Sequence, residues 1–168
     1  LRLIRLPNVF TALADICAGF LTARALVSGS GWASLPFLLL ASACLYLAGM
    51  AFNDIADRHA DAQTRPSRPL PSGAVTLRGA VRCGLALLLM GLLCAGLAGW
   101  TATPATPLPV LCAGLLALAV LSYDFLARDL PGGGPLMLGV CRSLNLLLGM
   151  STAPRIAEHL LGMGAWRV

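Results

Sequence analysis

Long apolar runs separated by short polar connections dominate this chain. A helix needs about 20 residues to cross the hydrocarbon layer of a membrane. Five runs are of about this length, and they cover residues 8–28, 32–52, 77–100, 108–126 and 135–153. The pattern therefore predicts five transmembrane helices, and the residues after Pro154 allow a sixth.

Composition agrees with a membrane protein rather than a soluble one. Hydrophobic residues make up 58% of the 168 residues and charged residues 11%, and the mean hydropathy is +0.82. A water-soluble domain of this length could not hide so much apolar surface in one core. The sequence predicts an all-α fold, a polytopic bundle of about five or six transmembrane helices in a single domain over residues 1–168.

Basic residues are placed unevenly along the chain. Arginines cluster before the first predicted helix and over residues 58–82, whereas the connection over residues 101–106 carries no charge. By the positive-inside rule, the N-terminus, the connection after the second predicted helix and the turn at Arg128 face the cytoplasm, which we expect to be that of a bacterial inner membrane. Topology and an anion site explain this charge better than nucleic acid, so no nucleic-acid partner is expected.

Three of the seven acidic residues stand within eight positions where the second predicted helix ends. At 100° per residue, Asp54, Asp57 and Asp61 fall within about 60° and span about 10 Å of helix, so they form one acidic stripe. Their mutual repulsion, and the negative end of the helix dipole, call for a cation. Hard carboxylate oxygens suit Mg²⁺, which typically shares its shell with phosphate oxygens. A solvated acidic helix end paired with nearby arginines is the alternative.

Two arginines, each next to prolines, follow the stripe. The guanidinium forks of Arg65 and Arg68 suit phosphate oxygens, so carboxylates, metal and arginines together describe a cradle for diphosphate. Enforcement of cytoplasmic orientation is the alternative role for these arginines. The prolines over residues 66–71 prevent a regular helix and favour an extended, stiff path. Gly73 permits a turn, and Thr76 can cap the next helix.

These motifs resemble a known family. The sequence NDIADRHAD at 53–61 resembles the first aspartate-rich motif, N-D-x-x-D-x-x-x-D, of the UbiA-type membrane prenyltransferases. RPSRPLPSG at 65–73 resembles the R-P-x-R-P-hydrophobic-P-S-G segment that follows it there. Weaker similarities occur at the family's entry to its first helix and after its fourth helix, at Arg5-Leu6-Pro7-Asn8, Tyr123 and Arg128. We refer to residues 53–73 as the Asp/Arg segment.

The resemblance implies an activity. A prenyl diphosphate would lose its diphosphate on Mg²⁺, and the allylic carbon would pass to a hydrophobic or aromatic acceptor in the lipid bilayer. By this resemblance Asp54, Asp57 and Asp61 are the metal-binding and catalytic residues, and they stabilise the leaving group without a nucleophilic side chain. The carbocation would need electron-rich walls, for which Tyr46, Phe52 and Tyr123 are candidates; plain packing is the simpler interpretation.

Polar residues also share faces inside two predicted helices, Asn8 with Thr11 and Asp15 in the first and Arg142 with Asn145 in the fifth. Intramembrane ionisable residues usually pair or line a cavity, so we hypothesise that Asp15 and Arg142 face a shared substrate cavity, as a pair. Snorkelling of Arg142 to the surface is the alternative. The expected substrate-binding residues are thus Asn8, Asn53, Arg65, Arg68, Tyr123, Arg128, Arg142 and Asn145.

One departure from the family's pattern bears on the activity. The family carries a second aspartate-rich motif, and no counterpart occurs here, so we expect the chain to be the N-terminal part of the domain and inactive alone. Residues 141–151 also resemble a UbiA-like subgroup encoded in bacterial Ebo clusters. One alternative is a CDP-alcohol phosphatidyltransferase, although the chain lacks that family's D-G-x-x-A-R run. The other is a non-catalytic membrane subunit with a remnant diphosphate site.

Overall fold

The computed structural model describes residues 6–26, 32–127, 130 and 132–153. Within these ranges the fold is all-helical, as the apolar pattern predicts. The α-helices are α1 (Leu6–Leu26), α2 (Leu35–Ala56), α3 (Arg58–Thr64), α4 (Leu77–Thr101), α5 (Leu108–Ser122) and α6 (Gly133–Met150). A 3₁₀ turn, η1 (Trp32–Ser34), leads into α2, and a π-helical turn, η2 (Tyr123–Ala127), continues α5. The sixth helix allowed after Pro154 falls outside the described residues.

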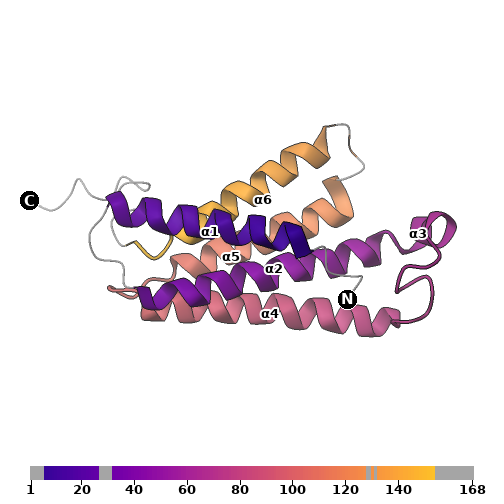
Figure 1. Ribbon diagram of the computed structural model, residues 1–168, viewed down its shortest axis with the longest axis horizontal. Helices are drawn as coiled ribbons and strands as arrows, with labels where there is room; N and C mark the ends of the chain where they lie inside the picture. The colour runs from indigo at the N-terminus through magenta and orange to yellow at the C-terminus, as the bar shows by residue number, and fades with distance from the viewer. Residues whose placement is uncertain (1–5, 27–31, 128–129, 131, 154–168) are drawn as a thin grey trace, which may run out of the picture.

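The long helices lie side by side with alternating directions. Figure 1 shows α1, α2 and α4 nearly aligned, with α5 behind them and α6 diverging at an angle. Helix α2 packs most extensively against α4, and α1 packs most extensively against α6. The end of α2, the short helix α3, the end of η2 and the start of α6 therefore share one end of the bundle.

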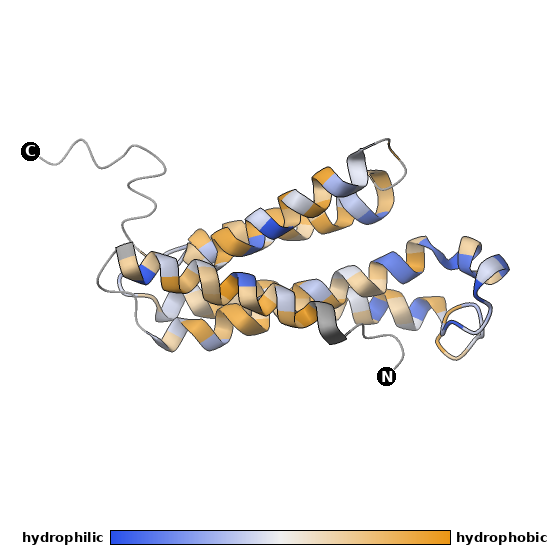
Figure 2. Ribbon diagram, turned by 45° about the horizontal axis from the view of Figure 1, so that its top comes forward, coloured by the Kyte–Doolittle hydropathy of each residue, from blue (hydrophilic) through white to orange (hydrophobic). Residues whose placement is uncertain are grey.

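Three helical segments in the described part are long and apolar enough to cross a membrane: Trp32–Ala56, Leu77–Thr101 and Leu108–Ala127. Helices α1 and α6 match the other two predicted spans in position, and each carries a charged residue near its middle, Asp15 in α1 and Arg142 in α6. Figure 2 shows hydrophobic colour along the whole bundle and hydrophilic colour gathered around α3, with polar spots midway along α1 and α6. The exposed Trp100, at the end of α4 away from α3, suits a membrane interface.

Small residues let α2 and α4 approach closely. A side chain at Gly91 would press on Leu45, and one at Gly84 would press on the ring of Phe52. Small residues are typical of helix contacts in membranes, where packing replaces the hydrophobic effect. Phe52 is buried and its ring meets Phe125 edge-on at 6.3 Å. Phe52 therefore contributes to helix packing.

The segment between α3 and α4 differs in part from its prediction. No regular helix forms there, as the prolines predict, but the path is a series of turns rather than an extended chain. Backbone hydrogen bonds from Ser72 to Arg68 (2.9 Å) and from Val75 to Pro69 (3.0 Å) close these turns. Gly73 adopts a positive φ of 75°. Thr76 caps α4 as predicted, because its side chain accepts a hydrogen bond from the Gly79 amide at 3.1 Å.

A close approach between α1 and α6 generates a testable prediction. A Cβ atom at Gly19 would collide with the Leu146 carbonyl group, whereas one at Gly114 on α5 would meet no atom within 4 Å. We expect Gly19→Ala to lower the free energy of unfolding by about 1–3 kcal/mol, as overpacking does. Gly114→Ala should be neutral or stabilising by up to about 1 kcal/mol, since alanine favours helix.

Thermal and denaturant unfolding of the two purified variants in detergent would measure this difference. A Gly19→Ala protein as stable as Gly114→Ala would contradict the close α1–α6 packing.

Candidate active site

The acidic stripe continues across the junction between α2 and α3. Asp54 lies in the last turn of α2, Asp57 lies at the junction and Asp61 lies in α3. Helical hydrogen bonds continue across the junction, from the Asp57 amide to the Asn53 carbonyl (2.9 Å) and from the Asp61 amide to the Asp57 carbonyl (2.8 Å). The three carboxylates therefore keep close to the helical spacing that the sequence predicts. Asp61 is only 5% exposed, so its carboxylate needs a partner.

Arg68 is that partner. The turns after α3 bring its guanidinium back over the stripe, where Nη1 donates to Asp61 Oδ2 at 2.6 Å and to Asp54 Oδ1 at 3.3 Å. Two carboxylates from separate helices thus converge on one nitrogen atom. Charge-assisted hydrogen bonds of this kind are the stronger ones in proteins. The loop is therefore tied to the end of α2 by electrostatics as well as by its turns.

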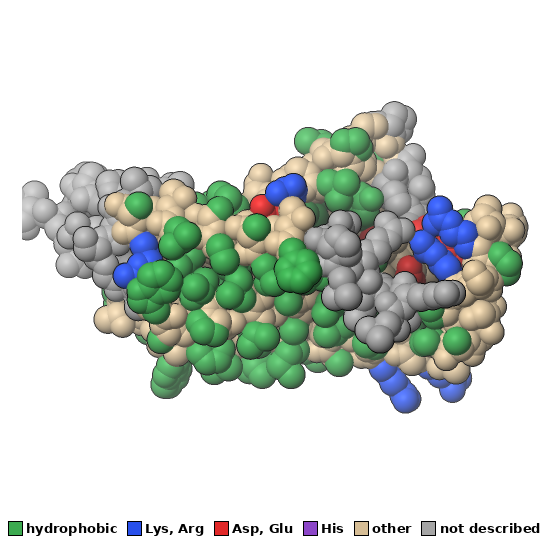
Figure 3. Space-filling model, viewed as in Figure 1, with side chains coloured by type: hydrophobic (Ala, Val, Ile, Leu, Met, Phe, Trp, Pro, Cys, Tyr) green, Lys and Arg blue, Asp and Glu red, His purple; other side chains and the backbone are tan. Residues whose placement is uncertain are grey.

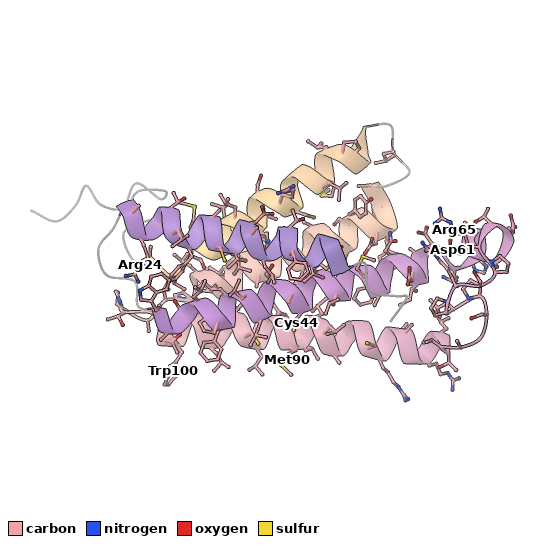
Figure 4. All side chains as sticks on the ribbon, viewed as in Figure 1. Arg24, Cys44, Asp61, Arg65, Met90 and Trp100 are labelled. Carbon is pink, nitrogen blue, oxygen red and sulfur yellow. The ribbon has the colours of Figure 1, made fainter. Side chains whose placement is uncertain are left out.

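Arg65 lies beside the same cluster but forms fewer side-chain interactions than Arg68. Its backbone amide ends α3 by donating to the Asp61 carbonyl at 2.7 Å, while its side chain is exposed. Figure 4 labels Arg65 and Asp61 close together at the α3 end, far from Arg24. Within the described ranges its guanidinium forms no ion pair with a carboxylate. The group is accordingly available to an anion that reaches this end of the bundle.

The stripe does not form a ready-made metal cage. No group of three or more Asp, Glu, His or Cys side chains in the described part lies close enough together to hold a metal ion. The positive guanidinium of Arg68 occupies the convergence point of two carboxylates. The donor set nonetheless fits a divalent cation, because Asp54 and Asp61 already present hard oxygens to a single positive atom.

A cavity of about 540 Å³ adjoins this cluster, between α1, α2, α5 with η2, and α6. One face of α2 lines it from end to end, with residues spaced three and four apart: Ser42, Leu45, Tyr46, Gly49, Met50 and Asn53. Eleven residues of helix separate the first from the last, which is about 16 Å. Asn53 precedes Asp54 directly, so the cavity reaches the Asp/Arg segment.

A polar pair marks that end of the cavity. Asn53 Nδ2 donates to Asp124 Oδ1 at 3.3 Å, across 71 positions of sequence, and Asp124 is buried. Asp124 and the lining residue Tyr123 belong to the π-helical turn η2, a geometry that is frequent at functional sites. The sequence interpretation missed Asp124. Its signal was a carboxylate inside an apolar run, next to a tyrosine that had already been singled out.

Two further polar groups line the middle of the cavity. Arg142 Nη2 donates to Asp15 Oδ1 at 2.8 Å, so the hypothesised pair is present and both residues line the cavity. Asn145 Oδ1 accepts from Ser42 Oγ at 2.8 Å, and Asn145 Nδ2 donates to the Ala12 carbonyl at 2.8 Å. Ser42 was also missed, because a serine within an apolar helix carries no distinctive signal.

The structure thus brings most of the expected site residues to one cavity and its polar end. Asn53, Tyr123, Arg142 and Asn145 line the cavity, and so does the candidate wall residue Tyr46. The positions of two expected site residues relative to the cavity are not described. Asn8 lies in α1 but its side chain is outside the described part, as is the whole of Arg128.

Comparison with known proteins identifies the family. The sequence profile of the UbiA prenyltransferase family matches residues 13–166. A digeranylgeranylglyceryl phosphate synthase of Natronomonas pharaonis is 32% identical over 137 residues, covering 80% of this chain and 47% of the relative. One of Metallosphaera sedula is 32% identical over 156 residues, covering 89% of this chain and 49% of the relative. The chain therefore spans about half the length of the curated relatives it matches.

A solved structure shares the fold. The apo form of a UbiA homologue from Aeropyrum pernix K1 superposes with a TM-score of 0.72 at 28% identity, and the match covers 89% of this chain and 51% of the homologue. Motif, profile and fold thus agree, and they leave the phosphatidyltransferase alternative without support. The chain belongs to the UbiA prenyltransferase family.

Proposed function

We propose that this chain takes part in the Mg²⁺-dependent transfer of a prenyl group from a prenyl diphosphate to a lipid-type acceptor in the membrane. One observation carries the proposal. A cavity with apolar walls ends, at Asn53, beside a cluster of carboxylates and arginines. A prenyl diphosphate has the matching form, with an apolar chain at one end and a highly charged group at the other.

Each polar residue of the cluster has a role in this proposal. Arg65 and Arg68 would bind diphosphate oxygens, since both guanidinium groups have donors to spare and lie at the same end of the bundle. Asp54, Asp57 and Asp61 would hold Mg²⁺. When bound, the metal would supply stabilisation of the negative charge that develops on the departing diphosphate. Arg68 would turn from the two carboxylates toward the diphosphate as those carboxylates take up the cation.

The walls of the cavity would protect the cationic prenyl group. Leu45, Met50, Leu116 and Val120 exclude water from the path along α2. The ring of Tyr123, near Asn53, offers an electron-rich face where the allylic carbon would separate from diphosphate. No nucleophilic side chain is needed, because the acceptor itself forms the new bond to carbon.

The distribution of charged residues supports a location of the site at the cytoplasmic face of the membrane. The Asp/Arg segment shares its end of the bundle with Arg78 and Arg82, on the exposed surface of the first turns of α4. At the opposite end, the connection over residues 101–106 has no charged residue, and Arg24 lies in the last turn of α1. We therefore propose that the diphosphate is delivered and released at the cytoplasmic face. The relatives' names describe a glyceryl phosphate product, and we extend only a lipid-type acceptor to this chain.

Binding of a radiolabelled prenyl diphosphate tests the proposal. For the chain in nanodiscs, geranylgeranyl diphosphate should bind with Mg²⁺ and dissociate on chelation. Asp54→Asn and Asp61→Asn should each weaken binding at least tenfold, about 1.4 kcal/mol, because both carboxylates face the same cation position. Arg82→Gln is the matched control and should bind like the parent chain. Binding that is unaffected by both aspartate changes would overturn the metal assignment, and no binding at all would favour the remnant-site alternative.

The ion pairs of Arg68 give a second prediction, on local stability. Arg68→Gln removes the guanidinium group that bridges Asp54 and Asp61. Loss of one partner of a buried pair costs about 3–5 kcal/mol, and we expect about 1–3 kcal/mol here because the Arg68 side chain is 22% exposed. Hydrogen exchange of the α3 amides should therefore accelerate at least fivefold.

Arg65→Gln is the matched control for this measurement, since its guanidinium pairs with no described carboxylate. Added Mg²⁺ should restore the protection in Arg68→Gln. Equal exchange in the two variants would show that the Arg68 ion pairs do not hold α3.

A further inference from the structure

The ion pair between Asp15 and Arg142 stands apart from the Asp/Arg segment. Each residue is near the middle of its helix, α1 or α6, and the two meet where these helices flank the cavity. Figure 3 shows a blue and a red group in contact on this face, separate from the charged cluster at the α3 end. Charged residues at such a depth in a membrane bundle are unfavourable unless they have a function.

Packing between α1 and α6 does not require the pair. The backbones of these helices already meet at Gly19 against Leu146 and at Gly149 against Ile16. Asn145 adds a hydrogen bond from its buried side chain to the Ala12 carbonyl at 2.8 Å. An ion pair with one hydrogen bond and an arginine side chain that is 63% exposed adds little to such a contact.

Arg142 has N–H donors that form no hydrogen bond within the described part of the chain. The side chains of Ser42 and Asn145 bond to each other, and Asn145 also bonds to α1, so this network is closed. Arg142 has five N–H donors, and in the described part of the chain it gives one hydrogen bond, to Asp15. Arg142 lines the cavity, and its planar fork has the form that matches a phosphate or carboxylate group.

The position of Arg142 separates it from the proposed diphosphate site. Arg142 lies one helical turn before Asn145, and Asn145 bonds to Ser42. Ser42 is about 16 Å along α2 from Asn53, where the cavity meets the Asp/Arg segment. Two cationic positions are therefore separate: Arg68 belongs to the Asp/Arg segment beside the Asn53 end of the cavity, and Arg142 lines the middle of the cavity.

We propose that Arg142, oriented by Asp15, binds the anionic headgroup of the lipid-type acceptor. This inference rests on the proposed function, because it assigns the second substrate of the same cavity. An anion held at Arg142 would place the acceptor beside the prenyl chain whose diphosphate lies at Arg68. Asp15 is then a positioning residue, which holds the guanidinium toward the cavity and neutralises it when no headgroup is bound.

Binding of dodecyl phosphate to the chain in a neutral detergent tests the assignment, with dodecanol and inorganic phosphate as comparison ligands. Dodecyl phosphate should bind at least tenfold more tightly than either. Arg142→Gln should remove this advantage, Arg142→Lys should keep part of it, and Arg82→Gln should not change it. Asp15→Asn should tighten binding severalfold, because the asparagine oxygen can still accept the hydrogen bond that orients Arg142, while the negative charge beside the phosphate is removed.

Several results would overturn the assignment. Unchanged binding in Arg142→Gln would do so, and so would weaker binding in Asp15→Asn, as expected of a purely structural pair. Inorganic phosphate that binds as tightly as dodecyl phosphate would indicate a free anion as the ligand. Asp61→Asn separates the two proposals, since it should impair Mg²⁺-dependent prenyl diphosphate binding and leave dodecyl phosphate binding intact. If the parent chain binds dodecyl phosphate but not prenyl diphosphate, only the proposed function is refuted.

Discussion

The guanidinium of Arg68, shared between Asp54 and Asp61, is the interaction on which this site depends. A carboxylate as buried as that of Asp61 is unfavourable without a positive partner, and a second carboxylate nearby adds repulsion. Arg68 compensates both the burial and the repulsion, because its Nη1 atom forms ion pairs with an oxygen of Asp54 and an oxygen of Asp61. The prolines and turns that follow α3 matter for this interaction, because they bring Arg68 back to the acidic stripe within a few residues. The same ion pairs thus fix the shape of the loop and neutralise the buried carboxylates.

A second constraint orders the cavity. Polar groups inside a membrane bundle must find partners there, and this chain satisfies them in two different ways. Ser42 and Asn145 form a closed network that fixes α6 against α1 and α2. Arg142 lines the cavity and, within the described part of the chain, forms a single hydrogen bond, to Asp15. Arg68 and Arg142 thus give two separate cationic positions, one beside the Asn53 end of the cavity and one in its middle.

The sequence predicts some features of this structure well and others poorly, for physical reasons. Helix positions follow from apolar runs, so α4 begins at the predicted Leu77 and ends one residue beyond the predicted boundary. The acidic stripe follows from helical spacing, which persists through the break at Asp57. The extended path expected of the prolines was wrong, because backbone hydrogen bonds such as that from Val75 to Pro69 depend on the folded loop. Asp124 escaped notice because its partner Asn53 is 71 positions away and a π-helical turn aims it inward.

A structure of the chain with Mg²⁺ and an unreactive prenyl diphosphate analogue would test the central claim most directly. The account predicts the cation between Asp54 and Asp61, the guanidinium of Arg68 on diphosphate oxygens, and the prenyl chain along the α2 face that runs from Asn53 toward Ser42. A structure in which Arg68 still bonds to Asp61, with the analogue bound elsewhere, would contradict it.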